Sequence, residues 1–238
     1  RFSAEYSGKP LDYYRNLRVT NPSNYLYFYD FGDYQIIGAS PESLVSVKHG
    51  QVTTNPIAGT RPRGKDERED KALAEELLAD EKEVAEHRML VDLGRNDIGK
   101  IAQNNSVEVT KYMEVEYFRY VMHLTSVVRG QLLPQLTAMD ALKSTLPAGT
   151  VSGAPKIRAM KRIYELEQEK RGVYAGAIGY LSATGDMDFA IAIRTMILKN
   201  GRAYVQAGAG IVYDSIPTNE YQETINKAKS MTKIGEMQ

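Results

Sequence analysis

Apolar positions recur at two different spacings along the first half of the chain. Residues 25–55 contain short runs rich in Tyr, Phe, Ile and Val between Gly, Asp and Pro, a pattern typical of strands joined by turns. Residues 65–93 repeat apolar positions at helical spacing and predict a helix in two pieces, after a loop over residues 56–64 that Gly and Pro punctuate. Residues 106–131 predict two more strands.

The second half continues the mixture of helices and strands. Residues 136–146 predict a short helix and residues 147–153 a loop. Residues 154–169 predict an amphipathic helix with basic and apolar faces, in which Pro155 suits the first turn. Residues 217–233 predict a closing helix.

Three strand patterns lie between these last two helices, separated by hairpin turns at Thr184-Gly185 and Asn200-Gly201. Because adjacent strands are joined by hairpins more often than by helical crossovers, we predict an α+β fold, with antiparallel sheets in a layered sandwich and helices packed outside. The lack of a repeat or linker predicts one domain over residues 1–238. Its start at Arg1, without a linker, suggests a domain truncated at its N-terminus.

Composition narrows the classes of function. The chain has 238 residues, 42% of them hydrophobic, which is enough for one sizeable core. Lys plus Arg and Asp plus Glu both total 30, so no global field attracts nucleic acid or an anionic membrane. With no cysteine there is no disulfide and no thiolate ligand, so a metal must bind oxygen or imidazole. These features, with no apolar run long enough to span a membrane, fit a cytoplasmic protein.

Two predicted helices each carry a pair of glutamates three residues apart: Glu83 with Glu86, and Glu220 with Glu223. At this spacing both carboxylates share one helix face. If the two faces met, their oxygens would suit a hard cation such as Mg2+, with water and substrate in its remaining positions. The spacing alone also fits a solvated acidic face, which is the more common use of glutamate.

Small-residue turns offer backbone N–H groups to an anion at two places. Gly59 and Thr60 lie in PIAGTRPRG, and Gly208, Ala209 and Gly210 lie in QAGAGIV. A carboxylate could bind at either turn, although tight-turn geometry is the more common reason for such glycines. Neither turn has the spacing of a nucleotide-binding fingerprint.

Two basic side chains are candidates for holding an anion. Arg194 interrupts the apolar strand pattern FAIAIRTMIL, where a guanidinium could grip a carboxylate; an internal ion pair or an exposed strand end is the alternative. Lys227 follows Glu223 by four residues, so it could reach the same cavity or form an ordinary helix-surface pair.

Four further side chains carry weaker signals. His123 lies in the apolar run YVMHLTSVV, where it could exchange protons or simply be a hydrogen-bonded core residue. His87 would point away from Glu86 and is expected to be structural. Tyr174 is one of 16 tyrosines, and Thr150 could serve as a helix cap or turn residue.

Seven blocks of sequence resemble the chorismate-utilising enzymes and occur in the order of that family. The blocks are PIAGTRPRG, AEHRMLVDLGRNDIGKIA, YVMHLTSVVRGQL, LPAGTVSGAPKIRAM, RGVYAGAIGYLS, FAIAIRT and QAGAGIVYDSIPTNEYQETINKA. The resemblance runs from about NPSNYLYF to the final helix. It implies the chorismate-binding fold, chorismate as substrate and Mg2+ as cofactor.

The resemblance also implies roles for the acidic side chains. Glu86 and Glu223 match the Mg2+ ligands. Glu83 and Glu220 match nearby carboxylates that handle protons or water, with Glu83 as general acid for the departing C4 hydroxyl of chorismate. His123 matches the histidine associated with pyruvate elimination.

The two carboxylates of chorismate have matching positions as well. Gly59 and Thr60 match contacts to the ring carboxylate, and Thr150 and Lys227 match positions lining the same pocket. The enolpyruvyl carboxylate is expected to be held by a phenol, a guanidinium and a small-residue turn: Tyr174, Arg194, Gly208, Ala209 and Gly210.

Single positions favour the anthranilate synthase branch of the family, which forms anthranilate and pyruvate in the first committed step of tryptophan synthesis. Aminodeoxychorismate synthases typically read PIKGT with a covalently acting lysine, whereas Ala58 has only a methyl group. The sequence SGAPK also favours the anthranilate synthase branch. Isochorismate and salicylate synthases need a lysine at a position upstream of Arg1, so these alternatives stay open, as does an inactive regulatory chorismate-binding module.

The resemblance implies partners too. Ammonia would come from glutamine through a glutamine amidotransferase subunit, because this chain has no cysteine nucleophile. Asn24, Tyr25 and Leu26 match part of a tryptophan feedback site, whose other part belongs to an N-terminal half with no counterpart in this sequence.

Overall fold

The computed structural model describes residues 1–232, which divide into two compact units. The first unit comprises residues 1–43, 164–178 and 190–238, and the second comprises residues 44–163 and 179–189. Among residues 1–232, no helix is long and apolar enough to cross a membrane. One domain over the whole chain remains a prediction.

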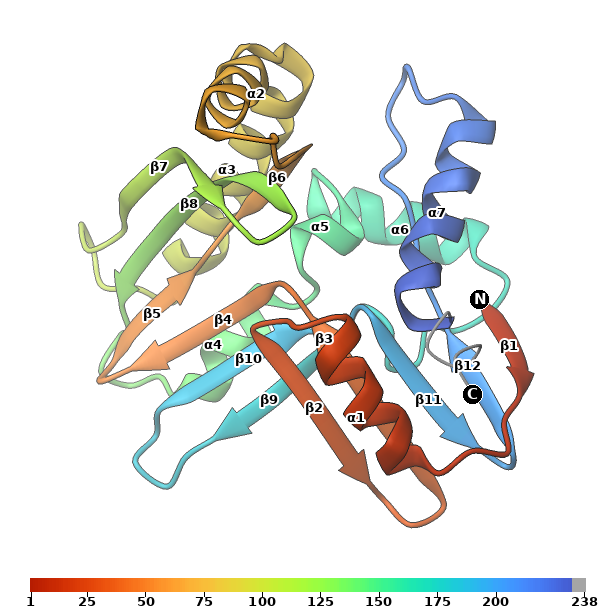
Figure 1. Ribbon diagram of the computed structural model, residues 1–238. Coiled ribbons are helices and arrows are strands. Elements are labelled where there is room, and N and C mark those ends of the chain that lie inside the picture. The colour runs from red at the N-terminus through yellow and green to blue at the C-terminus, as the bar shows by residue number, and fades with distance from the viewer. Residues whose placement is uncertain (233–238) are drawn as a thin grey trace. The chain divides into compact units, whose positions relative to one another are not determined.

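The first unit is built on a five-stranded sheet in which each pair of neighbouring strands runs antiparallel (Figure 1). Its order is β1 (Phe2–Glu5), β12 (Arg202–Val205), β11 (Thr195–Lys199), β3 (Tyr34–Ser40) and β2 (Tyr25–Asp30). The edge strand β1 pairs Phe2 with Val205, so the sheet joins two segments that lie far apart in the sequence.

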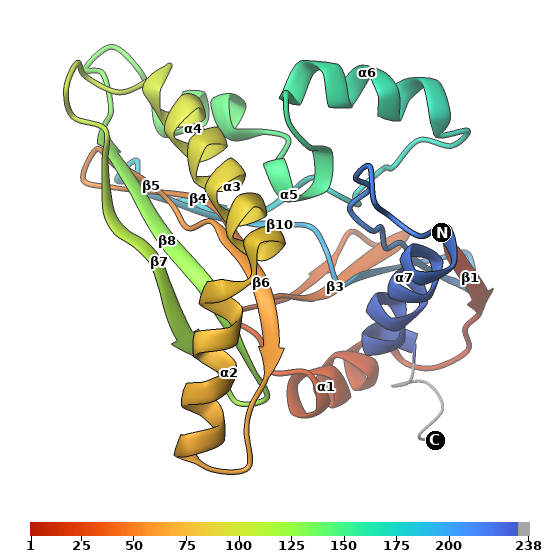
Figure 2. The same ribbon diagram turned by 90° about the horizontal axis from the view of Figure 1, so that it is seen from above.

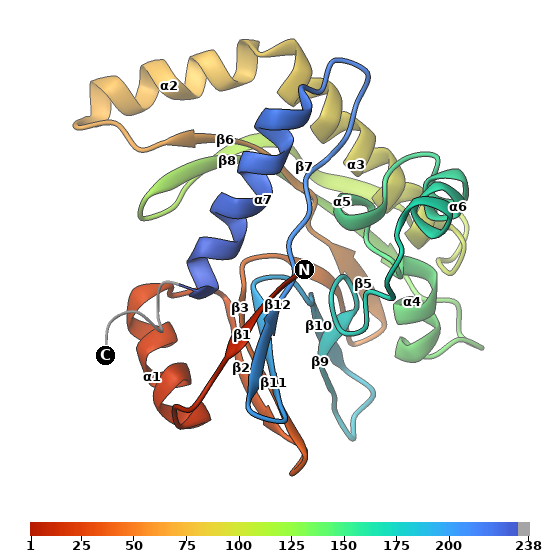
Figure 3. The same cartoon turned by 90° about the vertical axis from the view of Figure 1, so that its right-hand side faces the viewer.

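Helices α1 (Pro10–Thr20) and α7 (Pro217–Thr232) close the core of the first unit. Tyr13 and Leu17, four residues apart on α1, are both buried and pack with α7 residues against β3, β11 and β12. The Tyr13 hydroxyl donates to the Met231 carbonyl at 2.6 Å, which ties the end of α7 to α1 (Figure 3).

The second unit carries most of a seven-stranded sheet centred on the long strand β8 (Val121–Gln131). The strand β7 (Glu108–Tyr117) pairs with β8, and the remaining order is β6 (Ile57–Pro62), β8, β5 (Gln51–Thr54), β4 (Ser43–Lys48), β10 (Met187–Ile191) and β9 (Ala177–Leu181). Both β6 and β5 pair with the same edge of β8, one at each of its ends. The chain between them, residues 55 and 56, therefore runs along β8.

Helices α2 (Glu67–Ala79) and α3 (Glu81–Gly99) pack on β6 and β8 (Figure 2). Asp66 caps α2 by accepting from the Glu69 amide, and Asp80 caps α3 by accepting from the Lys82 and Glu83 amides. One aspartate therefore separates the two helices and fixes where α3 begins. The shorter helices are α4 (Ala138–Thr145), α5 (Gly149–Ser152) and α6 (Lys156–Leu166).

The predicted α+β class with antiparallel sheets is confirmed. The two-piece helix is α2 and α3, and the Asn200-Gly201 hairpin has both residues at positive φ, as a primed turn requires. The closing helix is also confirmed, except that Lys233 lies outside the described residues.

Three local predictions were wrong. Residues 56–64 are not only a loop, because Ile57–Pro62 pairs with β8 as β6. Residues 147–153 include the helical turn α5. The pattern FAIAIRTMIL is two strands, because the chain breaks between β10 and β11 where Arg194 adopts φ +48°. Strand β1 and helix α1 had no prediction.

Candidate functional site

The Gly59 turn interrupts β6 and exposes backbone beside α3. The register with β8 shifts between Ala58 and Thr60, and Gly59 has φ +73°, a conformation that L side chains rarely adopt. A Cβ on Gly59 would lie 3.1 Å from the Leu77 Cδ1 atom and 3.3 Å from the Glu83 Oε2 atom. The glycine therefore allows the Glu83 carboxylate to approach the β6 backbone.

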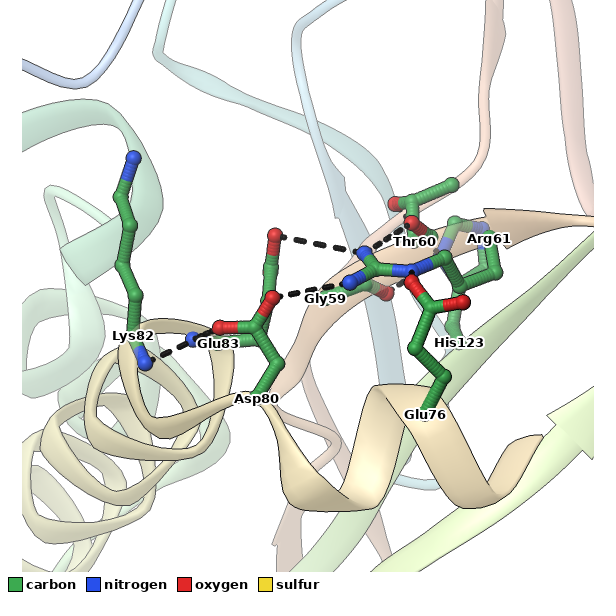
Figure 4. A network of polar contacts seen from close by, with 8 residues as sticks. All are labelled: Gly59, Thr60, Arg61, Glu76, Asp80, Lys82, Glu83 and His123. Atoms are coloured by element: carbon green, nitrogen blue, oxygen red, sulfur yellow. Dashed lines mark hydrogen bonds and ion pairs between the residues drawn. The ribbon is translucent and has the colours of Figure 1, made fainter. Parts of the chain in front are cut away.

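His123, on β8, joins this turn through its Nδ1 atom. Nδ1 lies 3.0 Å from the Thr60 Oγ1 atom and 3.0 Å from the Gly59 carbonyl oxygen (Figure 4). Because a carbonyl oxygen only accepts, it favours the tautomer with the proton on Nδ1, which leaves the lone pair on Nε2. Burial lowers the His123 pKa, partly offset by the Gly59 hydrogen bond. The geometry and burial therefore favour a neutral imidazole with its lone pair on Nε2.

Glu83 lies in the first turn of α3 and is about half-buried. Burial raises its pKa, and the neighbouring carboxylates of Glu86 and Asp80 raise it further, while Arg61 and Lys82 lower it. Glu86, one turn later, is exposed. Glu83 therefore retains its proton to a higher pH than an ordinary glutamate, and Glu86 is accessible to solvent.

In the first unit, a second group of predicted residues gathers around the start of the QAGAGIV turn. The Lys227 ammonium pairs with the Glu223 carboxylate and donates to the Gly208 carbonyl at 3.2 Å. A Cβ on Gly208 would lie 2.8 Å from the Tyr174 Oη atom. Gly208 is therefore a close-approach position as well as a turn residue.

Arg194 belongs to the same group. Its positive φ is uncommon for a residue with a side chain, and its carbonyl accepts from the Ala39 amide at 3.1 Å, which fixes the break in the sheet. Burial lowers the Arg194 pKa, while Tyr174, Glu42 and Glu223 oppose this shift in that order. A largely buried guanidinium with these neighbours fits a partner of negative charge.

A cavity of about 340 Å³ lies at the start of α7, and two of the predicted residues line it. Ala209 and Glu220 contribute to its wall, and Ile211 and Tyr221 give it an apolar rim. Gly210 is exposed between them. Glu220 also lies one turn before Glu223, so the two carboxylates share the helical spacing predicted from the sequence.

The remaining predicted residues lie outside these two groups of contacts. Thr150 is exposed on the single turn α5, whose N-cap is Ala148, so it is not a helix cap. Asn24 directly precedes β2, and Tyr25 and Leu26 are its first two residues. Leu26 packs against the core of the first unit.

Carboxylate oxygens that could bind a divalent cation are present around the Gly59 turn and around the QAGAGIV turn. Neither group of described residues contains a full set of metal ligands by itself. Among residues 1–232, no three His, Cys, Asp or Glu side chains are grouped so that they could hold a metal ion. Burial, and after it the nearby Glu86 carboxylate, raise the Glu83 pKa, so a cation beside this pair would offset the repulsion between the two carboxylates. Carboxylate oxygens of this kind fit Mg2+.

Sequence reasoning missed Arg61, Asp80 and Glu42. The Asp80 signal was available, since an aspartate three residues before Glu83 is typical of a helix N-terminus. No spacing in the sequence indicated Arg61 as a site residue, because its carboxylate partners come from α2, α3 and the residue between them. Glu42 is separated from Arg194 by most of the chain, so only the fold places it nearby.

Comparison with known proteins gives consistent matches. The chorismate binding enzyme family matches residues 1–233. A curated relative, anthranilate synthase component 1 of Lactococcus lactis, is 63% identical over 236 residues, covering 99% of this chain and 52% of the relative. The chain spans about half the length of the curated relatives it matches.

Solved structures of chorismate-utilising enzymes are also similar to this chain. The crystal structure of anthranilate synthase component I from Streptococcus pneumoniae is 84% identical with a TM-score of 0.91, covering 97% of this chain and 51% of that chain. The menaquinone-specific isochorismate synthase of Escherichia coli is 28% identical with a TM-score of 0.86, covering 97% and 53%.

The chain belongs to the chorismate binding enzyme family. Within that family, its similarity is much greater to proteins named anthranilate synthase component 1 than to the isochorismate synthase.

Proposed function

We propose that the chain is the catalytic part of an enzyme that aminates chorismate with ammonia and eliminates pyruvate to give anthranilate, with Mg2+ as cofactor. The observation that carries this proposal is the 63% identity to a protein named anthranilate synthase component 1 over nearly the whole chain. Ala58 supports the same branch, since its methyl group cannot replace the lysine amine of PIKGT sequences.

Glu86 and Glu223 are the proposed Mg2+ ligands, with Glu220 nearby. A bound Mg2+ would supply positive charge to the ring carboxylate of chorismate and so assist departure of the C4 hydroxyl. The exposure of Glu86 and Glu223 supports this role, because a ligand must reach an ion that also contacts substrate and water. Glu223 already pairs with Lys227, so metal binding would release that ammonium.

The two carboxylates of chorismate have separate proposed binding groups. Gly59 and Thr60 would hold the ring carboxylate through the irregular β6 backbone and the threonine hydroxyl. Arg194 would grip the enolpyruvyl carboxylate, and its burial makes that ion pair stronger than a solvated one. The remaining proposed contacts are Tyr174, Gly208, Ala209, Gly210, Thr150 and Lys227.

Glu83 and His123 are the proposed proton-transfer groups. The raised pKa of Glu83 favours its protonated form, which donates to the C4 oxygen as that oxygen leaves and ammonia adds at C2. The neutral His123 imidazole then takes the C2 proton on Nε2 as the enolpyruvyl C–O bond at C3 breaks. The ring becomes aromatic, and the released enolpyruvate becomes pyruvate.

The proposed partners follow from the same reaction. Ammonia would be supplied from glutamine by a glutamine amidotransferase subunit, since this chain has no cysteine for that chemistry. Asn24, Tyr25 and Leu26 are proposed as part of a tryptophan feedback site. The closest competing proposals are an aminodeoxychorismate synthase and an isochorismate or salicylate synthase.

A product assay tests the proposal. The protein at its natural length is incubated with chorismate, Mg2+ and ammonium, and fluorescent anthranilate is followed. Isochorismate formed without ammonium, or no consumption of chorismate, would refute the proposal. The second result would favour an inactive chorismate-binding module.

Variants test the assigned roles. Glu86→Gln and Glu223→Gln should each abolish Mg2+-dependent turnover while the fold is kept, whereas the exposed Glu81→Gln on the same helix as Glu86 is the matched control. His123→Ala should retain amination better than pyruvate release. A His123→Ala enzyme that forms anthranilate at the normal rate would contradict the assignment of His123.

A further inference from the structure

Arg61, on β6, and Arg63, directly after that strand, bind the two ends of helix α2. Arg63 binds the beginning of α2: its Nε atom lies 3.0 Å from both carboxylate oxygens of Asp70, and its Nη1 atom donates to the Phe118 carbonyl at 2.7 Å. Asp70 also accepts from the Gly64 amide at 2.7 Å. This contact lies at the end of α2 that is remote in sequence from α3.

Arg61 binds the other end of α2 and continues to α3 (Figure 4). Its Nε atom lies 2.8 Å from the Glu76 Oε1 atom, its Nη2 atom 2.8 Å from the Asp80 Oδ2 atom, and its Nη1 atom 3.8 Å from the Glu83 Oε1 atom. Nη1 also donates to the Thr60 carbonyl at 3.1 Å. Only 18% of the Arg61 side chain is exposed, and its guanidinium contacts three carboxylates and the β6 backbone.

These contacts fix the first turn of α3 relative to the Gly59 turn. Asp80 accepts from the Glu83 amide at 3.1 Å with its Oδ1 atom and contacts Arg61 with its Oδ2 atom. Arg61 therefore holds Glu83 through the cap as well as through its carboxylate. On the other side, a Cβ on Gly59 would lie 3.3 Å from the Glu83 Oε2 atom, so the carboxylate packs closely against the Gly59 turn.

We propose that Arg61 is a positioning residue, which holds the α3 cap against β6 and so aims the Glu83 carboxyl group at the substrate bound by the Gly59 turn. This inference rests on the proposed function, because it assumes that Glu83 is the general acid. Without Arg61, the carboxylates of Glu76, Asp80 and Glu83 repel one another with no nearby guanidinium, and the cap loses its tie to β6.

The expected effect is on the rate of chemistry. A displacement of about 1 Å in a reacting group can cost on the order of 100-fold in rate. Arg61→Met keeps much of the side-chain volume but removes the guanidinium, and we expect it to lower kcat by about 10- to 100-fold with KM for chorismate changed less than about threefold. Arg61→Lys keeps the charge and should recover part of that loss.

Arg63→Met is the matched control, because Arg63 binds Asp70 of α2 from the position directly after β6, and its hydrogen bonds and ion pair go to Asp70 and Phe118 rather than to Asp80 or Glu83. We expect Arg63→Met to lower thermal stability yet leave kcat within about twofold. Equal losses of kcat in Arg61→Met and Arg63→Met would overturn the proposal, as would a normal kcat in Arg61→Met. If Arg61→Met does not fold, the same comparison is made with Arg61→Lys and Arg63→Lys.

A double variant separates this inference from the proposed function. Glu83→Gln alone should lower kcat strongly, and Arg61→Met in the Glu83→Gln background should add less than about twofold, since both act through one carboxyl group. Losses that multiply would show that Arg61 does not act through Glu83 and would overturn the inference. An unaffected Glu83→Gln enzyme would instead overturn the acid role assigned in the proposed function.

Discussion

His87 is a buried imidazole whose protonation should make stability depend on pH. Its side chain is fully buried, and its Nε2 atom lies 2.6 Å from the Ser126 Oγ atom. Among the described residues, its Nδ1 atom has no hydrogen-bond partner. Burial lowers the His87 pKa to about 4, because the charged imidazolium loses hydration when it is buried.

The magnitude follows from linkage between protonation and folding. An unfolded histidine has a pKa of about 6.5, so between about pH 6.5 and pH 4 the unfolded chain binds a proton that the folded chain does not. Stability is therefore full above pH 6.5 and falls as the pH decreases. At about 1.4 kcal/mol per pKa unit, the loss reaches about 3 kcal/mol near pH 4 and then stops growing.

The assay compares the unaltered protein with His87→Gln, which can still hydrogen-bond Ser126 but does not titrate. Urea unfolding is measured from pH 7.5 to pH 4 in metal-free buffer, roughly the range that spans both pKa values. The difference in unfolding free energy between the two proteins should shift by about 3 kcal/mol in favour of the variant at low pH. A difference that stays constant with pH would refute the claim that His87 is neutral in the folded protein.

Three substitutions give further tests. Gly208→Ala places a Cβ 2.8 Å from the Tyr174 Oη atom and should raise KM for chorismate about tenfold, or about 1.4 kcal/mol, as measured by initial rates. Lys156→Met removes the ammonium that lies 2.5 Å from the buried Asp97 carboxylate and should cost about 3 kcal/mol of unfolding free energy in a urea titration. Gly59→Ala should cost about 1–2 kcal/mol because φ is +73°, and should slow anthranilate formation in the product assay.

The hydrophobic pattern predicted elements whose partners are close in sequence. The hairpin at Asn200-Gly201 and the helix break at Asp80 are local, since the turn residues and the cap are readable in the sequence. The prediction failed at β6, because Gly59 and Pro62 are normally turn residues. In the fold, β6 is at the edge of its sheet, where a bulge and a terminal proline are tolerated.

In the candidate site too, features that depend on nearby residues could be predicted, and features that depend on distant partners could not. Glu83, His123 and Gly59 were each chosen from separate motifs, and the structure brings these three together in the second unit. The left-handed backbone of Arg194 could not be predicted, because its strand pattern continues on both sides without a glycine or proline. Ion pairs such as Arg61 with Glu76 depend on packing between elements and have no spacing rule.

The pairing of Phe2 with Val205 affects how the protein can fold during synthesis. Strand β1 waits for about 200 further residues, which at ~5–20 residues per second takes roughly 10–40 s. This contact is therefore strongly non-local, because about 200 residues separate the two paired strands. Such pairings slow folding, because a long loop must close before the contact stabilises anything. A nascent chain that stalls before β12 emerges would keep an unpaired β1 available to chaperones or to other chains.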